Sequence, residues 1–185
     1  MIDTRRIKYI TFAAVSVALA FATSMIKIID MPMGGSVTLF SMMFICLVGY
    51  CCDLKTSLMA GVAYGMLQLL LDPYIVSIPQ MLIDYIFAFG ALGISGLFKG
   101  KSYGLYMGYA VAVLARLFFS VLSGIVFFAQ YVPDGMNPFI YSLMYNGAYI
   151  GLEAILTIIL MCVKPVRKII YFARTINDLY IPKEM

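Results

Sequence analysis

The segment YGLYMGYAVAVLARLFFSVLSGIVFFAQY, residues 103–131, contains a single charged residue, Arg116, and no proline. It is longer than the roughly 20 apolar residues that a helix needs to cross the hydrocarbon core of a bilayer. Its apolar residues do not alternate with polar ones, as they do in a membrane barrel strand. Because helices and closed barrels are the only spans that satisfy their backbone groups in lipid, this segment predicts a transmembrane helix.

The rest of the chain has the same character, since 63% of its residues are hydrophobic and only 12% are charged. Soluble domains are about half apolar and about a quarter charged. We expect one all-α integral membrane domain over residues 1–185, a bundle of six transmembrane helices followed by an amphipathic cytoplasmic tail at 164–185. Glycine, proline and charged residues delimit the six predicted spans at 7–29, 37–52, 57–71, 79–98, 103–131 and 138–163.

The basic residues predict the orientation of these spans. Cytoplasmic loops of membrane proteins carry an excess of lysine and arginine. The loops on one side contain only Lys27 together with acidic residues. The opposite loops and both tails carry most of the positive charge, at Arg5, Arg6, Lys8, Lys55, Lys99, Lys101, Lys164, Arg167, Lys168 and Arg174. Both termini are therefore predicted to be cytoplasmic.

Several function classes lack their required residues. The chain has no histidine, and its four cysteines form no pair of the CxxC type. It also has no glycine-rich phosphate loop and no hydrolase motif. The net charge of +4 is not arranged as a basic stripe interleaved with aromatic residues, so no nucleic-acid partner is expected. We predict neither a catalytic activity nor a metal or cofactor, and any driving energy must come from a partner or an ion gradient.

Three ionisable residues lie well inside the predicted spans, namely Asp84, Arg116 and Glu153. Burying each against lipid costs at least about 2.5 kcal/mol, so each should face the bundle interior. Arg116 and Glu153 lie at similar depth and favour a structural ion pair, with a substrate role as the alternative. Asp84 has no cation at its level, which makes it a candidate for binding a cationic ligand. The alternative is a hydrogen bond to a neighbouring tyrosine or water.

Polar and aromatic residues recur at helical spacing in the outer halves of three spans. They would converge on an aromatic-walled pocket with a few fixed polar groups, as small-molecule sites usually are, although polar stripes also join helices. The loops at 31–35, 72–74 and 131–138 could cover such a pocket. The stripes comprise Gln80, Asp84 and Tyr85; Arg116, Ser120, Ser123 and Phe127; and Tyr141, Ser142, Tyr145, Asn146, Tyr149 and Glu153.

The first span carries Ala14, Ala18 and Ala22, each four residues apart. Small residues at this spacing allow close helix approach. The spacing fits both packing inside the bundle and docking of another membrane protein.

Five sequence blocks, in order along nearly the whole chain, resemble the thiamine-specific substrate-binding S components (ThiT/YuaJ family) of energy-coupling factor (ECF) vitamin transporters. The blocks are Met31-Pro-Met-Gly-Gly-Ser-Val-Thr-Leu-Phe-Ser-Met42 followed by Gly49-Tyr50, Gly61-Val-Ala-Tyr-Gly-Met-Leu-Gln68, Pro79-Gln-Met-Leu-Ile-Asp-Tyr-Ile-Phe-Ala-Phe-Gly90, Ser123-Gly-Ile-Val-Phe-Phe-Ala129 and Tyr141-Ser-Leu-Met-Tyr-Asn-Gly147.

The resemblance implies a six-helix subunit in a prokaryotic cell membrane that binds thiamine from outside. Such a subunit docks on a transmembrane coupling protein of the EcfT type that carries two cytoplasmic ATPases, and it topples in the membrane to deliver the vitamin. The alanine stripe resembles the docking face of that family. The family's ligand residues correspond here to Asp84, Tyr85, Tyr74, Tyr141 and Asn146.

Three positions depart from the family pattern. Asp84 stands where glutamate is usual, Ser120 where histidine is usual, and Phe128 where some members have a tryptophan that stacks on the ligand. Phe128 can still stack on a cationic ring, though less strongly than tryptophan. The alternatives to a thiamine-binding subunit are the same fold specific for another pyrimidine or small vitamin, and a membrane scaffold without transport activity.

Overall fold

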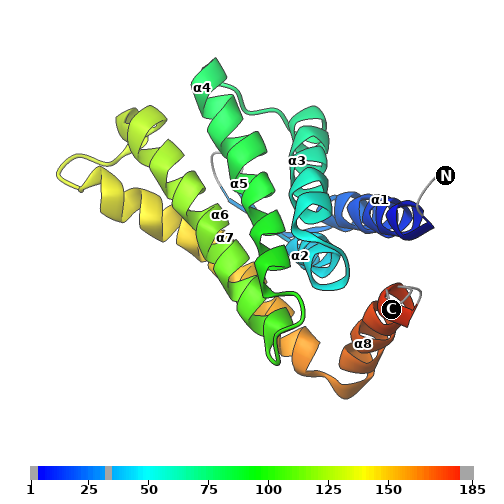
Figure 1. The fold of residues 1–185 in the computed structure, drawn as a ribbon. Helices are drawn as coiled ribbons and strands as arrows, with labels where there is room; N and C mark the ends of the chain where they lie inside the picture. Colours follow the sequence, from blue (N-terminus) through cyan, green and yellow to red (C-terminus); the bar gives the residue numbers. More distant parts are fainter. Residues whose placement is uncertain (1–3, 32–34, 180–185) are drawn as a thin grey trace.

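The computed structural model describes residues 4–31 and 35–179, and these residues are mainly helical (Figure 1). Four consecutive helical segments from Ile78 to Phe98 form one continuous rod. The helices are α1 (Thr4–Ser24), α2 (Ser41–Cys51), α3 (Leu54–Leu71), the rod of α4 (Ile78–Met81), η2 (Leu82–Phe87), α5 (Ala88–Gly90) and η3 (Ala91–Phe98), then α6 (Gly104–Phe127), η4 (Ala129–Tyr131), α7 (Pro138–Cys162) and α8 (Lys164–Leu179).

Six apolar helices confirm the predicted membrane bundle. Within the described residues, five are long enough to cross a membrane: Arg6–Ser24, Leu54–Leu71, Ile78–Phe98, Gly104–Phe127 and Pro138–Cys162. The sixth, α2, is shorter and largely buried. Large apolar side chains on the outer surfaces stay exposed, for example Leu70 at 80% and Ile78 at 72%. Such exposure is expected where lipid replaces water as the surrounding solvent.

The prediction of one helix over 7–29 is wrong at its end, because α1 stops at Ser24. Residues Lys27–Asp30 form strand β1, which pairs antiparallel with β2 (Ser36–Thr38). The stretch that leaves the helix contains consecutive isoleucines, which suit an extended backbone. The hairpin also shortens the second span, so that α2 begins at 41 instead of 37. The fold is therefore helical with one two-stranded hairpin.

The helix α3 packs directly against the composite rod and against α1. Gly65 of α3 faces the backbone carbonyl of Tyr85, and a Cβ atom built on Gly65 would overlap that oxygen. A residue without a side chain is therefore required for this close approach. The contact brings α3 against the part of the rod that carries Asp84.

The rod itself is irregular at the level of Asp84. Ser77 caps its start by accepting a hydrogen bond from the Gln80 backbone N–H, and Pro79 occupies the first turn. The segment η2 then widens into a π-helical turn that contains Asp84 and Tyr85. Such turns are rare and occur frequently at functional sites.

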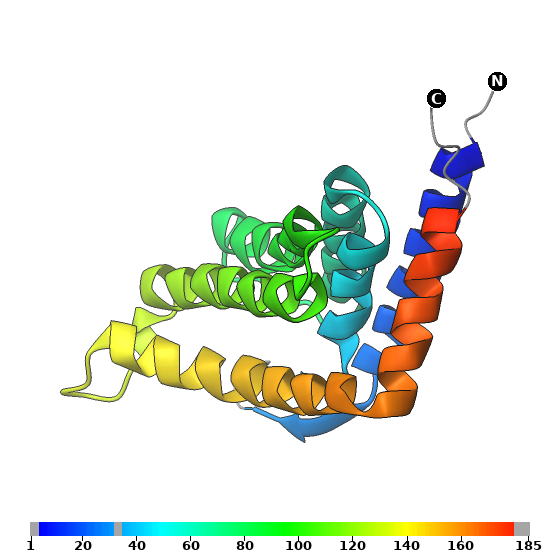
Figure 2. The same ribbon diagram turned by 60° about the horizontal axis from the view of Figure 1, so that its bottom comes forward.

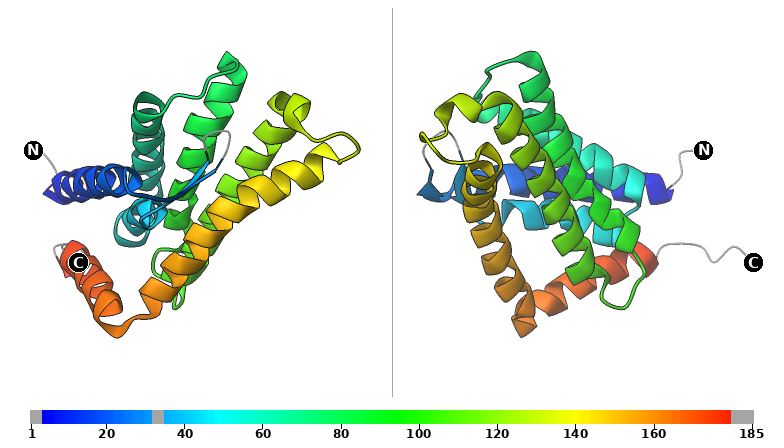
Figure 3. Two further views of the ribbon diagram at one scale, coloured as in Figure 1. Left: turned by 180° about the vertical axis from the view of Figure 1, so that it is seen from behind. Right: turned by 90° about the vertical axis from the view of Figure 1, so that its left-hand side faces the viewer.

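The tail forms α8, which leaves α7 at a sharp angle (Figure 2). Ile170 and Asn177 are buried, whereas Ile169 and Phe172 are exposed, so one face of α8 packs against α2 and α7. Residues 180–185 of the predicted tail lie outside the described part. The beginning of α1 and the end of α8 lie on the same side of the molecule in all views (Figures 1, 2 and 3).

Candidate functional site

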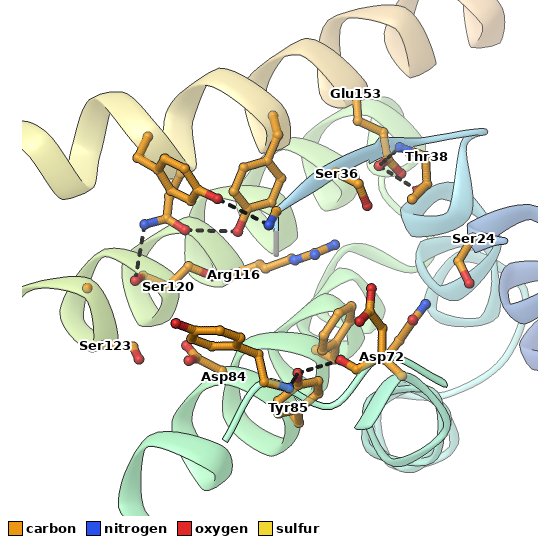
Figure 4. Close-up of a pocket in the computed structure, with 18 of the residues that line it drawn as sticks. Ser24, Ser36, Thr38, Asp72, Asp84, Tyr85, Arg116, Ser120, Ser123 and Glu153 are labelled. Atoms are coloured by element: carbon orange, nitrogen blue, oxygen red, sulfur yellow. Dashed lines mark hydrogen bonds between the residues drawn. The ribbon is translucent and has the colours of Figure 1, made fainter. Parts of the chain in front are cut away.

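A cavity of about 210 Å³ lies between α3, the rod, α6, α7 and the hairpin. The predicted residues Tyr74, Gln80, Asp84, Tyr85, Ser120, Phe128, Tyr141 and Asn146 all line it, together with Arg116 and Glu153. Figure 4 shows Asp84 and Tyr85 on one side of the space and the hairpin and Glu153 on the other. The structure thus brings together the residues that the sequence places on three separate spans.

Asp84 retains most of its hydrogen-bonding capacity. Among the described residues, its carboxylate accepts one hydrogen bond, from the side-chain amide of Gln80 at 2.6 Å. An ionised carboxylate can accept about four such bonds. Asp84 can therefore still bind a donor or a cation that enters the cavity.

Gln80 and Tyr85 support the loop between α3 and the rod. Gln80, at 1% exposure, accepts from the Val76 backbone N–H at 2.9 Å and donates to the Tyr74 carbonyl at 3.1 Å. The Tyr85 hydroxyl accepts from the Tyr74 N–H and donates to the Asp72 carbonyl, both at 2.9 Å. These two side chains fix the loop in place beside Asp84.

Aromatic rings line two walls of the cavity. Tyr74 stacks on Phe128 with ring centroids 5.7 Å apart and planes inclined by 27°. On α7, Tyr141 stacks on Tyr145, which meets Tyr149 edge to face. Aromatic faces of this kind attract a cation, most strongly where water is excluded.

Asn146 joins α6 to α7. Its side-chain nitrogen donates to the Ser120 carbonyl at 3.3 Å and to the Ser142 carbonyl at 3.0 Å. Its side-chain oxygen accepts from the Tyr149 hydroxyl at 2.8 Å. In this structure Asn146 therefore holds the two helices and orients Tyr149 in the cavity wall.

The predicted ion pair between Arg116 and Glu153 is wrong, because the two charged groups have other partners. The Arg116 guanidinium lies 4.2 Å from the Phe89 ring centroid, and its Nε has no hydrogen-bond partner among the described residues. The Glu153 carboxylate is instead used by donors from β2 and α2. The hairpin and the start of α2 supply those donors, and the Arg116 side chain extends along the cavity (Figure 4).

Sequence reasoning missed the hairpin's contribution to the cavity. Lys27, Ser36 and Thr38 line it, and the Gly35 N–H donates to the Tyr145 hydroxyl at 3.2 Å. The prediction placed Lys27 in the first span and Thr38 in the second, and of this region named only the loop at 31–35 as a possible cover of the pocket. The run of β-branched residues at 28–29 was the available signal for a strand.

The alanine stripe points away from the bundle. Ala14, Ala18 and Ala22 are exposed, while Ala13 and Ala20 on the other face of α1 are buried. The stripe therefore does not pack inside the bundle.

Comparison with known proteins adds to this geometry. The sequence model of the family described as "Thiamine transporter protein (Thia_YuaJ)" matches residues 10–172. The chain is 33% identical over 172 residues to the thiamine transporter ThiT of Bacillus subtilis (strain 168), covering 85% of this chain and 88% of that protein. It is 28% identical over 120 residues to the thiamine transporter ThiT of Lacticaseibacillus paracasei, covering 55% and 59%.

The fold is also similar to a solved structure. The ThiT structure from Listeria monocytogenes superposes with a TM-score of 0.74 at 22% identity, over 88% of this chain and 97% of that one. These findings confirm the resemblance seen in the sequence blocks. The chain belongs to the thiamine transporter protein (Thia_YuaJ) family.

Proposed function

We propose that this protein is the substrate-capture subunit of an ECF-type vitamin importer and that it binds thiamine in the cavity beside Asp84. The observation that best supports this proposal is that the Asp84 carboxylate can accept further hydrogen bonds and lies in a cavity lined by stacked aromatic rings. Thiamine combines a permanently cationic thiazolium ring with a planar aminopyrimidine. The cation would lie near Asp84 and the aromatic faces, and the amino group can donate to a carboxylate.

The family is one of thiamine transporters that are not enzymes. We propose that partner subunits supply the energy for uptake. We propose that Ala14, Ala18 and Ala22 form the docking face for a coupling subunit that carries two cytoplasmic ATPases. Their exposure in α1 supports this role. The positive charge of the loops near both termini supports a cytoplasmic location for both ends and an outward-facing cavity.

The proposal is tested by titrating the purified full-length protein with thiamine in detergent or nanodiscs. Because the chain has no tryptophan, calorimetry or radiolabelled ligand is the suitable readout. We expect saturable binding of one thiamine per chain, and much weaker binding of the neutral aminopyrimidine half alone. A folded protein that binds no thiamine would contradict the proposal, and competition with other pyrimidines and vitamins would then identify the ligand.

The outer edge of the hairpin is held by an exposed ion pair between Lys27 and Asp72, at 2.7 Å. Its hydrogen bond to Asp72 raises the pKa of the Lys27 amine, so the amine stays charged at neutral pH. Exposed pairs contribute at most about 1 kcal/mol, so Lys27→Gln should speed thiamine dissociation by up to about fivefold. Radioligand dissociation measures this. Lys55→Gln, at an exposed lysine on α3, should leave the rate unchanged.

A further inference from the structure

Glu153 is the most completely satisfied charged group in the cavity wall. It lies on α7 with 3% exposure, and four polar atoms surround its two oxygens. Oε2 accepts from the Thr38 N–H at 3.1 Å and the Thr38 hydroxyl at 2.7 Å. Oε1 lies 3.2 Å from both the Ser41 hydroxyl and the Met42 N–H. The Thr38 and Ser41 hydroxyls also lie 2.7 Å from each other, so their two protons serve three contacts and at least three donors engage the carboxylate. At most one acceptor site is then left for a ligand.

The donors all come from the junction between β2 and α2. The first backbone N–H groups of α2 have no partner within the helix, so they need an acceptor from another part of the chain. Phe40, just before α2, adopts a left-handed backbone conformation with φ of 60° and makes no side-chain cap. Such a conformation is strained at a non-glycine residue and persists only where surrounding contacts hold it. The carboxylate from α7 accepts the first-turn N–H of Met42 and so caps α2 from another helix.

The same junction forms part of the cavity wall. Thr38 lines the cavity, and the strand that contains it also carries Ser36. The hairpin's outer contacts differ from this one, since Lys27 and Asp72 form an exposed pair. The carboxylate of Glu153 is thus a buried attachment of the hairpin to α7, in addition to the bond from the Gly35 N–H to the Tyr145 hydroxyl.

We propose that Glu153 is a positioning residue for the ligand cavity, which fixes the inner end of the hairpin and the start of α2 to α7 without contacting the ligand. The consequence for ligand affinity rests on the proposed function of the cavity. The attachment itself does not, and can be measured without ligand.

The first test is amide hydrogen exchange of the full-length protein, comparing wild type with Glu153→Gln. Two backbone amides in residues 36–42 donate to the carboxylate. Losing hydrogen bonds to a charged group should accelerate exchange of this segment by about 10- to 100-fold. Thr157→Val is the matched control, because Thr157 is fully buried one turn further along α7 and makes no hydrogen bond to the hairpin. Unchanged exchange in Glu153→Gln would overturn the proposal.

The second test is a double-mutant cycle on thiamine affinity with Glu153→Gln and Thr38→Val. If both residues act through one attachment, the double variant should bind no more weakly than the weaker single variant, each being about tenfold reduced. If the affinity losses of the two single variants multiply in the double variant, the two residues contact the ligand separately, and the positioning role is overturned.

If Glu153→Gln does not fold, the Thr38→Val variant replaces it. This variant removes one donor and preserves the shape of the side chain, so it should still accelerate exchange of residues 36–42. No acceleration would overturn the proposal. Absence of thiamine binding in wild type, with accelerated exchange in Glu153→Gln, would refute the proposed ligand and leave the attachment supported.

Discussion

Replacing Asp84 with asparagine is expected to weaken thiamine binding by roughly 30- to 1,000-fold. Removing one partner of a desolvated charge pair costs about 2–4 kcal/mol, and each 1.4 kcal/mol is a factor of ten in affinity. Asparagine has nearly the same volume and can still accept from Gln80, which keeps the loop beside it in place. The loss should therefore come from the missing negative charge and not from a change in fold.

Calorimetric titration of wild type and Asp84→Asn at one ionic strength measures this loss. Asp134→Asn removes the same charge from an exposed position in the loop between η4 and α7 and should bind thiamine with unchanged affinity. Asp84→Glu restores the carboxylate on a longer side chain and should retain most of the affinity. If Asp84→Asn binds as tightly as wild type, Asp84 does not contact the cationic ligand.

Replacing Gly65 with alanine is expected to destabilise the protein by about 3 kcal/mol, although alanine is the better helix former. The added methyl group would overlap the Tyr85 carbonyl, which belongs to the π-helical turn. Backbone cannot move aside by changing a rotamer, so α3 and the rod must separate. Because Asp84 lies in the same turn, thiamine affinity should fall together with stability.

Thermal unfolding in detergent, followed by circular dichroism, measures this effect. Gly147→Ala is the matched control, because a Cβ atom at Gly147 in α7 meets nothing within 4 Å. That variant should be as stable as wild type or slightly more stable, through helix propensity alone. Equal stability of Gly65→Ala and Gly147→Ala would contradict the close packing of α3 on the rod.

Much of the cavity could be predicted because polar residues are scarce in this sequence. Asp84, Arg116 and Glu153 had to face inward, and all three line the cavity. The partners of these groups could not be predicted. Glu153 is 115 positions from Thr38, and no periodic pattern connects a strand residue to a helix in another part of the chain.

The sequence by itself determined the class of the protein, its helical spans and the set of polar groups that enter the bundle. These follow from local properties, since the length and polarity of a segment decide whether lipid can surround it. Only the tertiary structure decided that the Asp84 carboxylate can still accept hydrogen bonds from a ligand, whereas the Glu153 carboxylate is engaged by donors of the protein itself. The hairpin and the start of α2 bring their donors to Glu153 and none to Asp84, so two carboxylates inside the predicted spans receive different roles. Hydrogen bonding depends on which atoms meet within about 3 Å, and that is set by the packing of segments distant in the chain.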